Sequence, residues 1–337
     1  MPKRRRVDGA DSLHSDGPTA DGDQIAVTRS DIWFDDGSLV IQAENTQFKV
    51  HKGVLTRHSS VFADVFAMPH PEGEPTIEGC PVLQLQDSAE DINNFLLALY
   101  DRCSHTKDAI PLAVIAAMIR MGKKYDVPTL RDEGFARLNW EFPNTLESWD
   151  IQEADESYTR ITDNSSPRNH SVLFGTVELA HQCDIKTVLP TAYYNCCHDL
   201  DGLLYGYELD DGTRSKPLSH DIQRICVMGR EKLLDAQGEA YAEWVDCVGG
   251  TMAGCVTPQS CKAIGANLQY DLWRPKPIVR GLDRWSEFSA DMELSGLCGP
   301  CTEYGKQWYK VGREGIWRVL PSFFGLPPWD ELKNFES

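Results

Sequence analysis

The first third of the chain alternates short β-rich runs with helical periodicities. Residues 39–43 and 47–51 are β-rich, and the Glu-Asn-Thr step at 44–46 predicts a hairpin-like turn between them. Residues 81–85 return as an apolar strand, and Ser88 then opens a helix. Between these strands, apolar side chains recur at helical spacing: Val61, Phe62, Val65 and Phe66. The pattern predicts a compact α/β module made of a small sheet with helices.

Beyond this module the periodicity becomes mostly helical. A strong helix is predicted at 111–125, with Pro111 well placed in its first turn. Residues 145–170 are rich in turn-forming residues, which indicates a linker or a long ordered loop. A long helix capped by Ser219 comes next. We therefore expect an α+β protein whose second part is mostly α-helical.

The expected organisation is based on these changes in composition. Residues 8–24 hold hardly any apolar side chain, so the N-terminal segment should be disordered. The expected parts are a disordered segment at 1–28, an α/β domain at 29–140, a linker or long loop at 141–170, a helical domain at 171–250, and a Cys- and Trp-rich segment at 251–337 that packs on the helical domain.

Several motifs of the first module, taken in order, resemble the BTB (POZ) domain. They are Phe48-x-x-His51-Lys52-x-x-Leu55, His58-Ser59-x-Val61-Phe62-x-x-x-Phe66, the segment from Leu83 to Ile92, and Lys124-Tyr125-Asp126-Val127-Pro128. The resemblance is greatest to the BTB proteins that basidiomycete fungi carry in large numbers, and the run from Arg313 to Trp329 resembles their tail. It implies a BTB/POZ-like domain followed by a helical extension, and a protein that works by binding other proteins.

The same resemblance implies where partners bind. Members typically dimerise through the first strand and the first helices, and some recruit cullin-type ubiquitin ligases or transcriptional corepressors. The interface residues implied here are Asp36, Lys52, Leu55, Val61, Phe62, Val65 and Phe66, although some of the apolar ones must build the core instead. An aspartate usual at the start of the strand is replaced by Ser38, and a small shift would let Asp36 face Lys52.

Charge and composition limit the kinds of partner and the cellular locations that we expect. The net charge is −18, from 33 basic and 51 acidic residues, which argues against direct nucleic-acid binding. No apolar run is long enough to cross a bilayer. With no secretory signal pattern, we expect reduced thiols and a nuclear or cytoplasmic location. Lys3, Arg4, Arg5 and Arg6 form either a nuclear-import signal or a chance basic cluster.

Cysteines gather in the last quarter of the chain. Cys298-x-x-Cys301 has a spacing that can present two thiolates to one zinc ion. Cys255 and Cys261 would complete the set, with Cys247 as another candidate. The alternative is that all of them are buried free thiols, which behave as small apolar side chains. Apart from this structural zinc, no cofactor is expected.

Catalytic motifs are not found in the sequence. It holds no Gly-x-Ser-x-Gly, His-Glu-x-x-His, phosphate loop or dinucleotide fingerprint. We therefore expect a non-enzymatic, dimeric adaptor or scaffold, serving nuclear transcriptional regulation. The main alternative is a substrate adaptor of a cullin-type ubiquitin ligase, and a metal-dependent enzyme using the C-terminal cysteines is the remote one.

Overall fold

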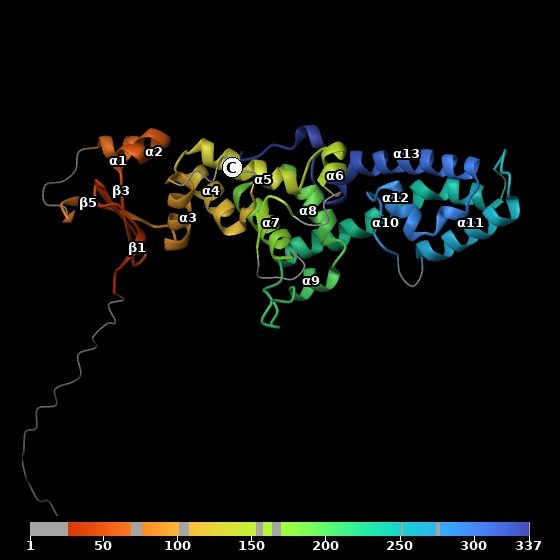
Figure 1. Cartoon of the computed structure of the whole chain (residues 1–337), viewed down its shortest axis with the longest axis horizontal. Coiled ribbons are helices and arrows are strands. Elements are labelled where there is room, and N and C mark those ends of the chain that lie inside the picture. Colours follow the sequence, from red (N-terminus) through yellow and green to blue (C-terminus); the bar gives the residue numbers. More distant parts are fainter. Residues whose placement is uncertain are drawn as a thin grey trace, which may run out of the picture.

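The computed structural model is elongated, with a β-sheet at one end and long helices at the other (Figure 1). It describes residues 26–68, 76–100, 108–152, 158–163, 170–250, 252–273 and 277–336. The chain does not simply run from end to end. Its C-terminus returns to the middle of the molecule, beside the helices that adjoin the sheet (Figure 1).

The sheet at the first end is mixed. Its strands are β1 (Thr28–Trp33), β2 (Leu39–Ala43), β3 (Thr46–Val50), β4 (Thr76–Ile77) and β5 (Cys80–Leu85), in the order β1-β3-β2-β5-β4. β2 and β3 form the predicted antiparallel hairpin, in which Ala43 faces Thr46 and Glu44 adopts a left-handed φ of 49°. β1 joins β3 in parallel, and β5 joins β2 in parallel. The central strands are buried along most of their length, because both faces of the sheet are covered.

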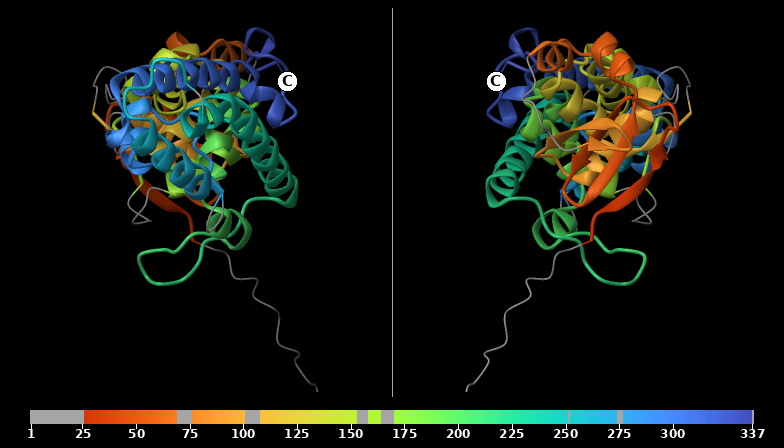
Figure 2. Two further views of the ribbon diagram at one scale, coloured as in Figure 1. Left: turned by 90° about the vertical axis from the view of Figure 1, so that its right-hand side faces the viewer. Right: turned by 90° about the vertical axis from the view of Figure 1, so that its left-hand side faces the viewer.

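Five helices follow along the chain at this end of the molecule, up to Glu141. They are α1 (Lys52–His58), α2 (Ser60–Ala67), α3 (Ala89–Tyr100), α4 (Leu112–Lys124) and α5 (Pro128–Glu141). Ser59 separates α1 from α2 with an extended backbone. Its hydroxyl accepts the N–H of Phe62 at 3.0 Å and donates to the Tyr125 carbonyl, which anchors this helix start to the end of α4. In Figure 2 the strands and α1 and α2 face the viewer in the right-hand view.

α4 belongs to two cores at once. Its Met118 and Met121 pack into the core of the sheet domain, together with Phe48 and Phe95. Ile115 and Ile119 instead belong to the core of the helical region. A single helix therefore joins the sheet domain to the helical region through apolar contacts on two of its faces.

Residues 141–170 differ from the expected linker or loop. They include α6 (Leu146–Gln152), which buries Trp149, and β7 (Ile161–Thr162), which pairs in parallel with β6 (Ile110–Pro111). Buried Glu141 accepts the backbone N–H of Thr159 at 2.9 Å and so fixes the entry to β7. Apolar and charged side chains anchor the described parts of this segment, which its turn-rich composition does not predict.

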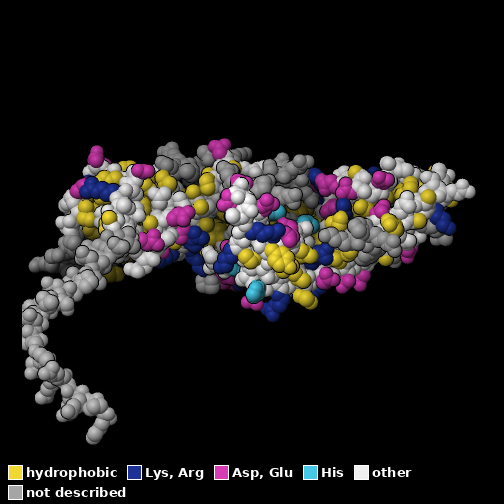
Figure 3. Space-filling view, turned by 90° about the horizontal axis from the view of Figure 1, so that it is seen from below, with side chains coloured by type: hydrophobic (Ala, Val, Ile, Leu, Met, Phe, Trp, Pro, Cys, Tyr) yellow, Lys and Arg dark blue, Asp and Glu magenta, His cyan; other side chains and the backbone are white. Residues whose placement is uncertain are grey.

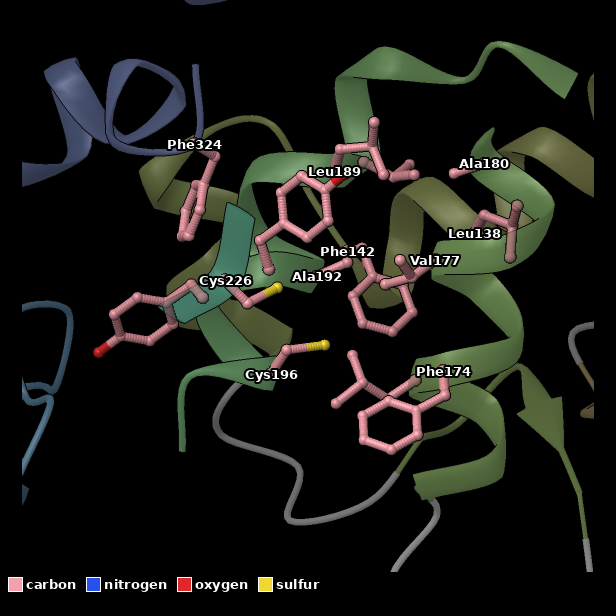
Figure 4. Packing of buried hydrophobic residues seen from close by; sticks show 14 of the residues in the cluster. Leu138, Phe142, Phe174, Val177, Ala180, Leu189, Ala192, Cys196, Cys226 and Phe324 are labelled. Carbon is pink, nitrogen blue, oxygen red and sulfur yellow. The ribbon is translucent and has the colours of Figure 1, made fainter. Parts of the chain in front are cut away.

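The second part of the molecule is helical. Its elements are α7 (His170–Cys183), η2 (Lys186–Val188), α8 (Leu189–Cys196), α9 (Leu200–Tyr205), α10 (His220–Gly250), α11 (Pro258–Trp273), α12 (Trp285–Asp291), η3 (Leu294–Gly296), α13 (Gly299–Phe323) and η4 (Trp329–Glu331). Its main core brings Phe142 of the α5 end, Val177 of α7 and Cys226 of α10 together (Figure 4). α10 and α13 lie side by side and form the far end together with α11 and α12 (Figures 1 and 2). This confirms the predicted α+β class, with a sheet domain followed by a helical region.

Candidate functional site

The helical pair α1–α2 carries most of the residues proposed as an interface, and the structure divides them into two groups. Leu55 and Phe62 are 0% and 1% exposed and belong to the core of the sheet domain. Val61 and Phe66 are half-buried and pack against that core from its edge. Val65 is half-buried outside this cluster, so it is the side chain of the set that is best placed to meet a partner.

An exposed methionine extends this apolar surface. Met68 directly follows α2 as its C-cap and is 61% exposed. It continues the helical spacing of Val61 and Val65, seven and three residues further along the chain, but was not among the residues predicted for the interface. Lys3 to Arg6 lie outside the described residues.

Asp36 contacts a different residue from the one that was expected. Asp36 lies in the turn after β1, and its Oδ1 is 3.0 Å from Nε2 of His51 rather than beside Lys52. This hydrogen bond lowers the pKa of Asp36 below its usual value. The Lys52 ammonium instead lies 4.9 Å from the ring centroid of Phe66, because α1 directs it towards α2. Ser38 accepts the backbone N–H of Lys52 at 3.0 Å and so takes a structural role at this position.

His51 is positioned from its other side by an aromatic group. The Tyr100 hydroxyl accepts the backbone N–H of His51 at 2.9 Å and lies 3.3 Å from its Nδ1. Phe34 stacks on Tyr100 with a centroid distance of 4.7 Å. The end of α3 is thereby tied to the start of α1. Asp36 contributes an exposed negative charge at the rim, since its side chain is 85% exposed.

The first strand leaves one edge of the sheet open. β1 lies at the end of the strand order, with β3 as its neighbour. An edge strand presents backbone N–H and C=O groups that can pair with another chain. Beside it, Glu78 binds Arg29 of β1 at 2.8 Å and the buried Lys49 of β3 at 3.1 Å. The hydrogen bond from Lys49 lowers the pKa of Glu78.

The far end of the molecule holds a cluster of four cysteines. The Sγ atoms of Cys255, Cys261, Cys298 and Cys301 all lie within 4.8 Å of one another. Three of these side chains are buried, and that of Cys255 is half-buried. Cys247 lies outside the group, and its sulfur accepts the Tyr304 hydroxyl at 3.7 Å. The fold therefore brings Cys298 and Cys301, the pair that spacing suggested, together with Cys255 and Cys261, two of the three candidates for the other pair.

The thiols of Cys298, Cys301 and Cys255 differ in acidity. The backbone N–H groups of Cys301 and Val256 hydrogen-bond the Cys298 sulfur and lower its pKa to about 6. Burial and the neighbouring sulfurs raise the pKa of Cys301. Burial also raises the pKa of Cys255.

The adjacent cysteines at the end of α8 are explained by packing. α8 ends at Cys196, and the thiol of Cys197 donates to the Cys226 carbonyl at 3.4 Å. Cys196 and Cys226 both point into the apolar core (Figure 4), so the Cys-Cys-His run at 196–198 is the end of a packed helix.

On the face shown in Figure 3, basic side chains are interspersed with acidic and apolar ones.

The helical region also has a concave surface. A groove of about 370 Å³ lies between α10 and α11, lined by Tyr241, Val245 and Leu272 together with polar Gln237, Asp246 and Gln269. Within the described residues, no helix is long and apolar enough to cross a membrane.

The first end of the molecule thus combines a small mixed sheet, whose edge strand is β1, with the helical pair α1–α2. Residues 34–139 match the BTB/POZ domain family, and the chain therefore contains a BTB/POZ domain. No curated protein and no solved structure gives a match to the chain. The family match confirms the resemblance seen in the sequence and supports a general role in protein–protein interaction.

Proposed function

We propose that this protein is a homodimeric adaptor that pairs through its BTB/POZ domain and presents its helical region to a client. The observation that carries the proposal is the BTB/POZ domain itself, at residues 34–139. Two surfaces at the sheet end of the molecule support self-association. These are the open edge of β1 and the apolar side chains at the end of α2, with Val65 half-buried and Met68 61% exposed.

The helical region supports the second half of the proposal. An adaptor needs a surface for its client as well as one for its partner copy. The groove between α10 and α11, of about 370 Å³, is a concave surface that combines apolar and polar side chains. It lies far from the BTB/POZ domain (Figure 1), so dimerisation would leave it open.

The cellular role that we propose is transcriptional regulation in the nucleus, resting on the basic run Lys3 to Arg6. Such runs act as flexible charged peptides that import receptors bind. A substrate adaptor of a cullin-type ubiquitin ligase is the alternative. Co-purification of a cullin that depends on residues 34–139 would favour that alternative over the nuclear role.

Size-exclusion chromatography with light scattering tests the dimer directly. We expect the full-length protein to have twice the mass of one chain, and Val65→Asp combined with Met68→Asp to convert it to monomer. Val311→Asp is the matched control, because Val311 is 56% exposed on α13 at the far end. A wild-type protein that stays monomeric over the whole concentration range would contradict self-association and leave the BTB/POZ surface to a different protein.

A further inference from the structure

We propose that Cys255, Cys261, Cys298 and Cys301 bind one Zn²⁺ ion in a closed four-thiolate site that holds the far end of the helical region together. The four sulfur atoms lie within 4.8 Å of one another in a buried position. The proposal is independent of the BTB/POZ domain and of the adaptor role.

The spacing of the sulfurs fits one tetrahedral ion. Zn–S bonds of about 2.3 Å at tetrahedral angles place sulfurs about 3.8 Å apart. The Sγ atoms of Cys255 and Cys298 are 3.8 Å apart. A disulfide would require about 2.05 Å between the sulfurs. An iron–sulfur cluster would place several inorganic atoms between its thiolates, and a spread of 4.8 Å leaves room for one ion only.

The backbone around the cluster is arranged to present sulfur lone pairs inward. Cys298 is the N-cap of α13, and Cys301 lies in the first turn of that helix. Cys261 lies in the first turn of α11. Two helix N-termini, each with partial positive charge, therefore converge on the sulfurs and favour their thiolate forms. Cys255 is brought in by a turn whose Gly254 has a φ of 93°, a conformation that other residues rarely adopt.

Hydrogen bonds to sulfur form a second layer around the site. The backbone N–H of Cys298 lies 3.4 Å from the sulfur of Cys261, and the Thr257 hydroxyl lies 3.2 Å from that same sulfur. Such outer contacts orient metal-bound ligands and tune their charge. Four negative sulfurs this close together would repel one another. A bound cation offsets that repulsion.

Zinc is the ion that this ligand set selects. Four thiolates in a tetrahedron are typical of structural zinc, and with all four positions filled the site has no open position for a substrate. Binding replaces the protons of the thiols, so that one Zn²⁺ and four thiols give a Zn(S)₄ centre of charge −2 and four released protons. The centre would link the turn before α11 to the start of α13, across the core that includes Trp244 and Phe288.

Metal analysis of the full-length protein, purified under reducing conditions without chelator, tests the proposal. We expect one zinc per chain by mass spectrometry of the metal content. After removal of the zinc, titration with Co²⁺ should produce an absorption spectrum typical of tetrahedral four-thiolate cobalt that saturates at one equivalent. The Co²⁺ titration uses the wild-type chain, so it decides the question even if cysteine variants fail to fold.

Variants then assign the ligands. Cys298→Ser combined with Cys301→Ser should lower the zinc content to below about 0.1 per chain, because two remaining thiolates do not hold the ion. Cys247→Ser is the matched control and should keep one zinc, since Cys247 lies outside the cluster. Four freely titratable thiols with no bound metal, disulfides among the four, or iron in place of zinc would each overturn the proposal.

Discussion

Arg313 of α13 and Asp150 of α6 form a two-pronged ion pair although 163 residues separate them in the sequence. One prong joins Nη1 to Oδ2 at 3.2 Å, and the other joins Nη2 to Oδ1. Arg313 is 9% exposed and also donates from Nε to the Leu282 carbonyl at 2.8 Å. A single guanidinium therefore joins three distant segments of the helical region.

Replacing this arginine should destabilise the helical region. We expect Arg313→Met to lower the free energy of unfolding by about 2–3 kcal/mol, because the Leu282 carbonyl and the Asp150 carboxylate lose their partner. Arg224→Met serves as the control, since Arg224 and its partner Asp221 are 74% and 85% exposed, and such pairs add little. Urea denaturation compares the two variants, and equal effects would contradict the structural role of Arg313.

The pair α1–α2 predicts unequal costs for two neighbouring phenylalanines. Phe62→Ala should lower the free energy of unfolding by about 3–5 kcal/mol, because the ring is fully buried in the sheet-domain core. Phe66→Ala should cost less than half as much, since Phe66 is half-buried at the edge of that core. Thermal and urea unfolding of both variants check this order. A larger loss from Phe66→Ala would show that the helix faces the core differently.

The pH dependence of stability should reveal a half-buried carboxylate, that of Asp283. Burial raises the pKa of Asp283 from 3.8 to about 7. A folded pKa above the unfolded one means that the folded state holds the proton more tightly. Asp283 therefore lowers the free energy of unfolding progressively as the pH rises from about 4 to about 7, and by a constant amount above that range.

Asp283→Asn removes this titration. We expect the stability of the variant, relative to wild type, to be higher at pH 8 than at pH 5 by at least about 1 kcal/mol, given 1.36 kcal/mol for each pKa unit. Urea denaturation at both pH values measures the difference. The same relative stability at pH 5 and pH 8 would show that Asp283 is ionised in the folded state throughout.

The basic run at the N-terminus gives a cellular prediction. Replacing Lys3, Arg4, Arg5 and Arg6 with alanine should abolish nuclear accumulation of a fluorescent fusion, because import receptors bind such runs through their charges. As a positive control, residues 1–10 alone should carry a reporter into the nucleus. Unchanged localisation of the full-length variant would remove the support for a nuclear role.

The sequence predicted features that depend on neighbours along the chain. The hairpin of β2 and β3 arises from two β-rich runs and a turn, and Ser219 precedes α10 and accepts the N–H of Ile222 at 3.4 Å, as expected of a cap. Cys298 and Cys301 also have a spacing typical of zinc ligands, and the fold brings them together with Cys255 and Cys261, whereas their binding of zinc stays a prediction.

Features that depend on packing could not be predicted in this way. A helical stripe on α2 does not say which side chain faces the core, so Phe62 and Val65 could not be separated. Asp36 contacts His51 rather than Lys52 because of the path of the turn after β1. Hydrophobic periodicity does not predict the path of a turn. Trp149 lies in a segment of turn-rich composition, and its burial depends on α8 and α13, whose Tyr194 and Trp317 rings it contacts.

The separation of the two ends has a consequence for how tightly a client is held. α10 alone contains 31 residues, which corresponds to a length of about 46 Å at 1.5 Å per residue. A dimer joined at the sheet ends would carry two identical far ends at a fixed separation. A client with two binding motifs at a matching distance would then bind both far ends at once. Its avidity would exceed the affinity of one motif by about 10²–10⁴-fold. Clients with one motif, or with two motifs too close together, would be released quickly.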